Sequence, residues 1–163
     1  MTILLKNKHT LLVGDFIFKC CIGKKGTTNF KKEGDLKTPK GIYKIEHLYY
    51  RSDRFKKPET KLKVIKIKKS MAWCDDARSL NYNKLIKKYN HTSYETLYRK
   101  DYKYDLLIPI KYNFEKPKPG KGSCIFLHLT KNYKPTKGCI ALKKRDFLIL
   151  LKIIDKKTKI KIL

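Results

Sequence analysis

The apolar residues of this chain come in short runs that lysine, glycine or proline interrupts. Runs of about four to eight apolar residues, or apolar and polar residues in alternation, are typical of β-strands. We therefore expect a β-rich domain, mainly β or α+β, with a mixed sheet and short helices. The pattern predicts strands at 2–6, 10–22, 41–51, 61–69, 104–113, 123–129 and 157–163.

Helical patterns occupy less of the chain. Residues 143–154 predict a helix, because apolar side chains recur on one helical face: Phe147, Leu148, Leu151 and Ile154. No internal repeat and no linker divides the 163 residues, so a single domain spanning 1–163 is expected.

Three further segments carry weaker signals. Residues 92–100 predict a helical turn or short helix, with Thr92 or Ser93 as its cap and Glu95 in its first turn. Residues 23–41 are rich in glycine, threonine and lysine and predict a long loop, which in a compact domain is usually functional. Within 104–113, Pro109 suits an edge strand or a bulge.

The charge is strongly positive, with 41 Lys+Arg against 14 Asp+Glu and a net charge of +27. Such a charge favours a polyanionic partner such as nucleic acid. However, the basic residues are mostly lysines spread along the whole chain, whereas base reading and bidentate phosphate contacts favour arginine. We interpret the charge as a composition bias and expect no specific nucleic-acid partner. The arginines are Arg51, Arg54, Arg78, Arg99 and Arg145.

The five cysteines are odd in number and show no CxxC spacing, which disfavours a disulfide framework or a zinc ribbon. Zinc binding by Cys124, His128 and Cys139 is a weak alternative. Positions 124 and 128 of one strand share a face but lie roughly 13 Å apart, too far for one tetrahedral ion. No metal and no cofactor is expected.

The first residues give no sign of an export signal, because Lys6, Lys8 and His9 interrupt them before a long apolar run develops. No run reaches the about 18 apolar residues of a membrane-spanning helix. The chain as written is expected to be cytoplasmic and monomeric, without a transmembrane segment.

One stretch, FLHLTKNYKPTKGCIAL, combines a histidine and a cysteine: His128 and Cys139. A thiol attacks an acyl carbon as thiolate, and a histidine in reach can take its proton and later give it to the leaving amine. A helix starting soon after Cys139 would also lower the pKa of the thiol. From spacing alone, a buried thiol and a core histidine remain the more common explanation.

The same stretch resembles the signature of YkuD-type L,D-transpeptidases, in which a histidine, a loop and then [S/T]-x-G-C followed by an aliphatic residue occur in order. Here the signature reads His128 and then TKGCIAL, residues 136–142. Upstream, KKEGDLKTPKGIYKI (31–45) is similar to the family's GDxxTPxG segment. Further similarities, including PGKGSCIFLHL (119–129), extend the resemblance over nearly the whole chain.

The resemblance implies a β-sandwich-like fold and a cysteine acyltransferase of peptidoglycan stem peptides or muropeptides. Cys139 would be the nucleophile and His128 the general base and acid, while Gly138, Thr136 and Lys137 would hold the oxyanion or position the substrate. The reaction is attack at the L-centre of diaminopimelate next to D-alanine, giving a thioester. An amine then forms a 3→3 cross-link, or water gives carboxypeptidase activity. This substrate implies the periplasm or cell envelope.

The chain departs from the best-studied members at three positions. Lys137 replaces the histidine before the Gly-Cys pair, Ala141 replaces an arginine or asparagine, and Leu129 replaces a glycine or serine. These departures bear on substrate contacts and on the acceptor rather than on the nucleophile and base. The alternative function is a non-enzymatic basic protein that binds nucleic acid or another polyanion on a degenerate copy of the fold.

Overall fold

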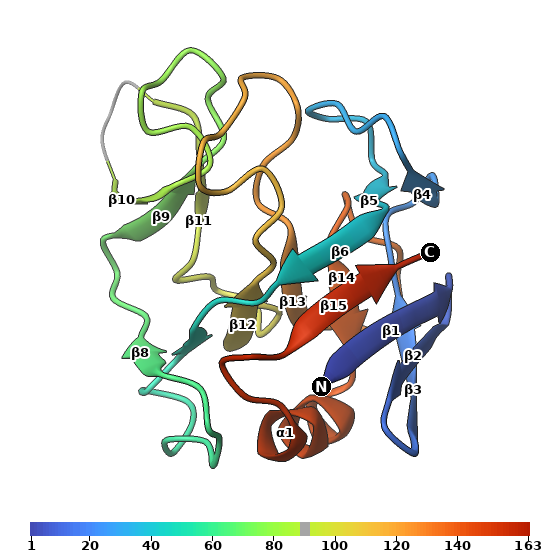
Figure 1. The fold of residues 1–163 in the computed structure, drawn as a ribbon. Coiled ribbons are helices and arrows are strands. Elements are labelled where there is room, and N and C mark those ends of the chain that lie inside the picture. The colour runs from blue at the N-terminus through green and yellow to red at the C-terminus, as the bar shows by residue number, and fades with distance from the viewer. Residues whose placement is uncertain (89–91) are drawn as a thin grey trace.

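A computed structural model describes residues 1–88 and 92–163 of the chain. These residues form one helix, α1 (Lys144–Ile153), and short strands arranged in three sheets (Figure 1). The strands are β1 (Thr2–Asn7), β2 (Thr10–Val13), β3 (Phe16–Cys21), β4 (Thr27–Thr28), β5 (Thr38–Pro39), β6 (Gly41–Lys44), β7 (Leu48–Tyr50), β8 (Val64–Lys66), β9 (Met71–Cys74), β10 (Leu85–Lys87), β11 (Tyr94–Thr96), β12 (Leu106–Pro109), β13 (Phe126–Leu129), β14 (Ile140–Leu142) and β15 (Lys159–Ile162).

The largest sheet is mixed and ten-stranded, in the order β6-β15-β1-β2-β3-β14-β13-β12-β7-β8. The pairs β1–β15, β13–β14 and β7–β8 are parallel, and the other neighbours are antiparallel. The sheet curls, so that β15 and β1 lie in front of β13 and β14 in Figure 1. This curled, mixed sheet with one short helix confirms the predicted YkuD-like, β-rich fold class.

The main hydrophobic core fills the inside of the curl and extends to α1. The helix buries Phe147, Leu150 and Leu151, which pack in one cluster with side chains of the facing strands such as Ile3 and Leu127. Burial of these apolar side chains between the helix and the strands is the main stabilising contribution to such a fold. The predicted helical face of 143–154 is therefore confirmed, although the helix begins at Lys144.

The central strands divide their side chains between two clusters, because successive residues of a strand point to opposite faces. Leu127 and Ile140 belong to the main core, whereas their neighbours Phe126 and Cys139 belong to a second cluster. This second cluster is more aromatic. It also contains Trp73, Tyr49 and Tyr104, and the three-stranded sheet β10-β9-β11 contributes to it.

The predicted short helix at 92–100 is wrong, because this segment contains β11, which pairs antiparallel with β9. The hydroxyl of Ser93 bonds Asp75 at 2.6 Å instead of capping a helix. The expected loop 23–41 contains two short paired strands, β4 and β5. Pro109 lies in an interior strand rather than an edge strand, next to a one-residue shift between the pairings Leu107–Tyr49 and Ile110–Ile45, as in a bulge.

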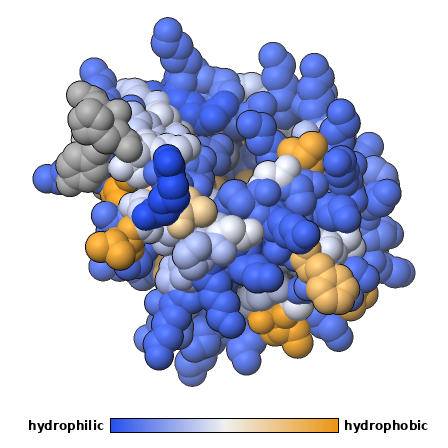
Figure 2. Space-filling view, turned by 90° about the horizontal axis from the view of Figure 1, so that it is seen from above, coloured by the Kyte–Doolittle hydropathy of each residue, from blue (hydrophilic) through white to orange (hydrophobic). Residues whose placement is uncertain are grey.

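No helix in residues 1–88 and 92–163 has the length and apolarity needed to cross a membrane. Figure 2 shows a face dominated by hydrophilic residues, on which hydrophobic side chains appear only in separate patches. Large exposed apolar side chains such as Leu80 and Phe30 lie in loops.

Candidate active site

His128 and Cys139 approach each other because β13 and β14 are adjacent parallel strands. His128 pairs with Ala141, and Cys139 precedes Ala141 by two residues, so both side chains lie on the same face. Diagonal neighbours of this kind on paired strands have backbones roughly 7–8 Å apart, within reach of long side chains. The eleven-residue separation in sequence thus becomes a diagonal position across one strand pair, although the two side chains form no hydrogen bond with each other in the resting protein.

Both residues line a cavity of about 840 Å³. Its floor is the face of β13 and β14, and its walls come from the 31–36 loop, from β11 with its flanking residues and from the 130–138 loop. His128 and Cys139 are only 6% and 7% exposed, so water has little access to either side chain. The cavity is large enough for a peptide segment and lies directly over the two candidate catalytic residues.

The His128 ring is fixed in one tautomer. Its Nδ1 lies 2.9 Å from the carbonyl oxygen of Leu129, which can only accept, so Nδ1 carries the proton and Nε2 is left as a base. Burial lowers the pKa of His128 to about 4, and the positive charges of Lys103 and Arg99 act in the same direction. Tyr104 packs edge-on against the ring with centroids 5.1 Å apart. At neutral pH the imidazole is uncharged and oriented.

The Cys139 thiol is protonated in the resting protein. It donates to the carbonyl oxygen of Cys124 at 3.1 Å and accepts the Phe126 N–H at 3.4 Å. Burial, followed by the negative charge of Glu95, raises the pKa of Cys139 to about 12. The expectation that a nearby helix terminus lowers this pKa is wrong: β14 separates Cys139 from α1.

The turn before Cys139 is held by Thr136. Its hydroxyl donates to the Cys139 carbonyl at 2.6 Å and accepts the Gly138 N–H at 3.1 Å. Gly138 has φ +149°, and a Cβ there would lie 2.9 Å from the carbonyl oxygen of Lys37. Glycine is required at this position because the two backbones approach so closely.

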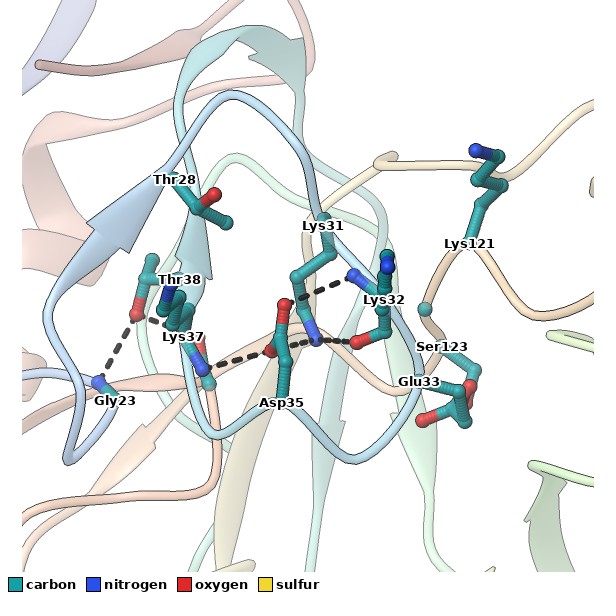
Figure 3. Close-up of polar contacts among 12 residues, drawn as sticks. Gly23, Thr28, Lys31, Lys32, Glu33, Asp35, Lys37, Thr38, Lys121 and Ser123 are labelled. Atoms are coloured by element: carbon teal, nitrogen blue, oxygen red, sulfur yellow. Dashed lines mark hydrogen bonds and ion pairs between the residues drawn. The ribbon is translucent and has the colours of Figure 1, made fainter.

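The 31–45 segment braces this turn. Thr38 accepts the Gly23 N–H at 3.0 Å and donates to the Gly138 carbonyl at 2.8 Å, and its side chain is fully buried. Figure 3 shows Asp35 beside it, where one carboxylate binds Lys31 Nζ at 2.7 Å and also accepts the N–H groups of Lys32 and Lys37. The GDLKTPKG segment, residues 34–41, is therefore a rigid support for the turn before Cys139.

The remaining predicted site residue, Lys137, is exposed at the edge of the cavity. Two residues in the cavity went unnoticed in the sequence. Glu95 and Tyr104 face Cys139 and His128, and the Tyr104 hydroxyl donates to Glu95 Oε1 at 2.6 Å. The only available signal, a glutamate within the predicted helix at 92–100, pointed to an N-terminal turn instead of a site.

Cys124, named above in the zinc alternative, also lines this cavity. It has a left-handed backbone conformation with φ 54°, which directs its carbonyl to Cys139 and its own thiol toward the carbonyl of Trp73. Among the residues that the structure describes, no three His, Cys, Asp or Glu side chains are grouped so that they could hold a metal ion.

A comparison with known families finds a match that covers almost the whole chain. The YkuD model, described as the L,D-transpeptidase catalytic domain, matches residues 1–162. No curated protein and no solved structure matches the chain. Since the matched segment includes the whole ten-stranded sheet and every residue of the cavity, the chain belongs to the YkuD family of L,D-transpeptidase catalytic domains.

Proposed function

We propose that the protein is a cysteine acyltransferase that acts on peptidoglycan stem peptides. The observation that carries this proposal is the placement of Cys139 and His128 on one face of adjacent parallel strands, at the floor of one cavity. Family membership supports the reaction class, and the anionic stem peptide suits a cavity edged by the exposed lysines Lys131, Lys134 and Lys137.

At the start of the first half-reaction, the Cys139 thiol and the His128 imidazole are both uncharged. Sγ of Cys139 attacks the carbonyl carbon of the L-centre of diaminopimelate, and its proton passes to Nε2 of His128. The tetrahedral intermediate collapses as the bond to D-alanine breaks, and His128 returns the proton to the leaving amine. The Leu129 carbonyl stabilises the transient imidazolium through Nδ1–H. A thioester on Cys139 and free D-alanine result.

The oxyanion of this intermediate needs backbone donors close to Sγ. The Gly138 N–H is already bonded to Thr136 in the resting protein, so we assign the main role to the N–H of Cys139 itself. One such donor is typically worth about 3 kcal/mol in the transition state. Thr136 contributes by fixing the turn from which this N–H projects.

The second half-reaction decides the product. An amine of a neighbouring stem, or water, attacks the thioester while His128 takes its proton, and the Cys139 thiolate leaves and is reprotonated by His128. An amine gives a 3→3 cross-link and water gives a shortened stem. Ala141, where other members often carry arginine or asparagine, lies at this face, so the acceptor contacts at this position differ from theirs, whereas Leu129 points into the main core on the opposite face.

The proposal is tested by intact-mass measurement after incubation with a carbapenem, followed by purified tetrapeptide muropeptides. We expect one covalent carbapenem adduct that is absent in Cys139→Ala, and release of D-alanine from the muropeptides with the same dependence. Cys124→Ala is the matched control, because this second buried cysteine lines the same cavity yet its thiol points toward Trp73.

The same experiment separates the rival function. A protein that forms no Cys139-dependent adduct but binds DNA with a steep salt dependence would be a polyanion-binding member of the family. The net charge of +27 alone does not favour that function, because the basic residues are mostly lysines spread along the chain and arginine is scarce.

A further inference from the structure

A carboxylate faces the nucleophile across the cavity. Glu95 lies in the middle of β11, where its backbone pairs with Trp73, and its side chain lines the same cavity as Cys139 and His128. Its negative charge acts on three groups that also line the cavity, because it raises the pKa values of Cys139, Cys124 and Tyr104. A cysteine enzyme gains nothing in its resting state from such a charge.

The hydrogen bonds of Glu95 leave one oxygen available. Oε1 accepts the Tyr104 hydroxyl at 2.6 Å and lies 3.9 Å from the Arg99 guanidinium. Within the described residues, Oε2 accepts no hydrogen bond, and it is not sealed away from the cavity. Arg99 is itself committed, since it forms two bonds of 2.8 and 2.9 Å to Asp101. The carboxylate is therefore held in place but not neutralised by a close ion pair.

Burial raises the pKa of the Glu95 carboxyl, while the Tyr104 hydroxyl and the positive charges of Arg99 and Lys137 oppose the shift. The negative charge of Asp75, which lies on the same side of the cavity, adds to it. A partly desolvated carboxylate with a free oxygen gains most from a cation that arrives in the cavity.

We infer that Glu95 receives an ammonium group of the substrate through Oε2, in the cavity that it shares with Cys139 and His128. This contact would offset the negative charge that acts on the thiol. The inference rests on the proposed function and narrows its substrate. The acyl donor carries a free amine close to the scissile carbonyl, as diaminopimelate does at its D-centre. Binding and activation are then coupled, because the thiol proton moves to His128 more readily when the ammonium is in place.

Tyr104 joins this carboxylate to the base. Its hydroxyl donates to Glu95, and its ring packs edge-on against His128. The ammonium site and the catalytic pair therefore share one rigid side chain. Glu95 acts through charge, whereas Tyr104 is a positioning residue.

The first test measures the rate of alkylation of Cys139 by iodoacetamide, a neutral probe, between pH 6 and 10 by peptide mass. In Glu95→Gln the amide still accepts the Tyr104 hydroxyl, but the charge is gone, so alkylation at neutral pH should be about tenfold faster, corresponding to about one unit of thiol pKa. Glu59→Gln, which removes an exposed carboxylate paired with Lys152, should leave the rate unchanged. Tyr104→Phe keeps the charge and should not accelerate the reaction.

The second test compares two acyl donors, a tetrapeptide with the free amine and the same peptide with that amine acetylated. The wild type should prefer the free amine by roughly 10- to 100-fold in kcat/KM, as expected for a charged hydrogen bond. Glu95→Gln should lose most of this preference, and Glu59→Gln should retain it. In Glu95→Gln, alkylation should thus become faster while turnover of the free-amine peptide becomes slower. Loss of a merely structural residue would not change the two rates in opposite directions.

Several results overturn the inference. These are an unchanged alkylation rate in Glu95→Gln, a wild type indifferent to acetylation, or a variant that keeps the full preference. The wild-type comparison needs no variant and so holds even if a substitution impairs folding. If no stem peptide acylates the wild type, the proposed reaction fails, and the alkylation rates still decide whether Glu95 opposes the thiolate.

Discussion

The two faces of strands β12, β13 and β14 are built from alternate residues of the same short segments, yet they differ in character. One face consists of aliphatic side chains such as Leu106, Leu127 and Ile140 and is closed by α1 and the opposing strands. The other combines aromatic residues with Cys139 and opens into the cavity. One face supplies stability and the other places reactive groups, so a one-residue slip would exchange the two.

The largest effect on stability is expected on the closed face. Leu127→Ala should reduce the free energy of unfolding by about 2–5 kcal/mol, because a fully buried side chain leaves a cavity behind it. Urea unfolding gives the value. Ala141→Ser, on the open face of the adjacent strand, should cost about 1 kcal/mol or less, since its hydroxyl can face the cavity. Equal losses of unfolding free energy in the two variants would contradict the assignment of stability to the closed face.

A buried neutral histidine should make stability depend on pH. The pKa of His128 falls from 6.5 to about 4 on folding, so between these values the unfolded chain binds the proton more readily. This contribution is complete above pH 6.5 and decreases as the pH falls toward 4, by about 3 kcal/mol in total. Unfolding curves at several pH values should show it.

Other groups also titrate between pH 4 and 6.5, so the contribution of His128 is isolated by comparing the wild type with His128→Gln. The difference in unfolding free energy between wild type and variant should shrink as the pH is lowered from 7 to 4. A difference that stays constant over this range would mean that the histidine is not held neutral by its surroundings.

A smaller effect is expected from Thr38, whose hydrogen bonds support the turn before Cys139. Thr38→Val removes the bonds to Gly23 and Gly138 with little change in shape, and the carbapenem acylation rate should fall roughly 10- to 100-fold through misplacement of Cys139. Thr28→Val is the matched control in the same segment, since the Thr28 hydroxyl accepts the nearby Phe30 N–H and, within the part of the chain that the structure describes, makes no bond to the turn before Cys139. Equal acylation rates in the two variants would show that the Thr38 hydrogen bonds do not position Cys139.

The smallest effect is expected at Lys137. Its exposed charge near Cys139 should favour the thiolate, so Lys137→Ala should slow iodoacetamide alkylation by at most about threefold, as solvent screens the interaction. Lys156→Ala removes an equally exposed lysine elsewhere and should have no effect. A thiol pKa that Lys137→Ala leaves unchanged would exclude any electrostatic contribution.

Much of the fold is readable from the sequence because its signals are local. The alternation at 157–163 predicts β15, and the apolar face of 143–154 predicts α1. The error at 92–100 has a long-range cause: pairing with β9 outweighs a weak cap signal. Secondary structure that depends on a distant partner strand leaves little trace in its own residues.

Prediction of the site from the sequence is limited in the same way, because it depends on contacts between distant segments. His128 and Cys139 were identifiable through the family signature, but their shared face depends on the parallel register of β13 and β14, which no spacing rule specifies. Glu95 was placed in the wrong element, and its position opposite the thiol follows from the packing of a separate sheet. The high pKa of Cys139 likewise comes from burial, a property of the folded protein.

The position of β15 has a consequence for synthesis on the ribosome. This strand lies between β6 and β1, so residues 159–162 join two strands that were translated long before them. During elongation β1, β2 and β3 can pair as they emerge, while β6 must wait with an unpaired edge. Closure of the curled sheet between β6 and β1 therefore requires that residues 159–162 have been synthesised, and chains stalled before residue 159 should be recognised by chaperones through the unpaired edge of β6.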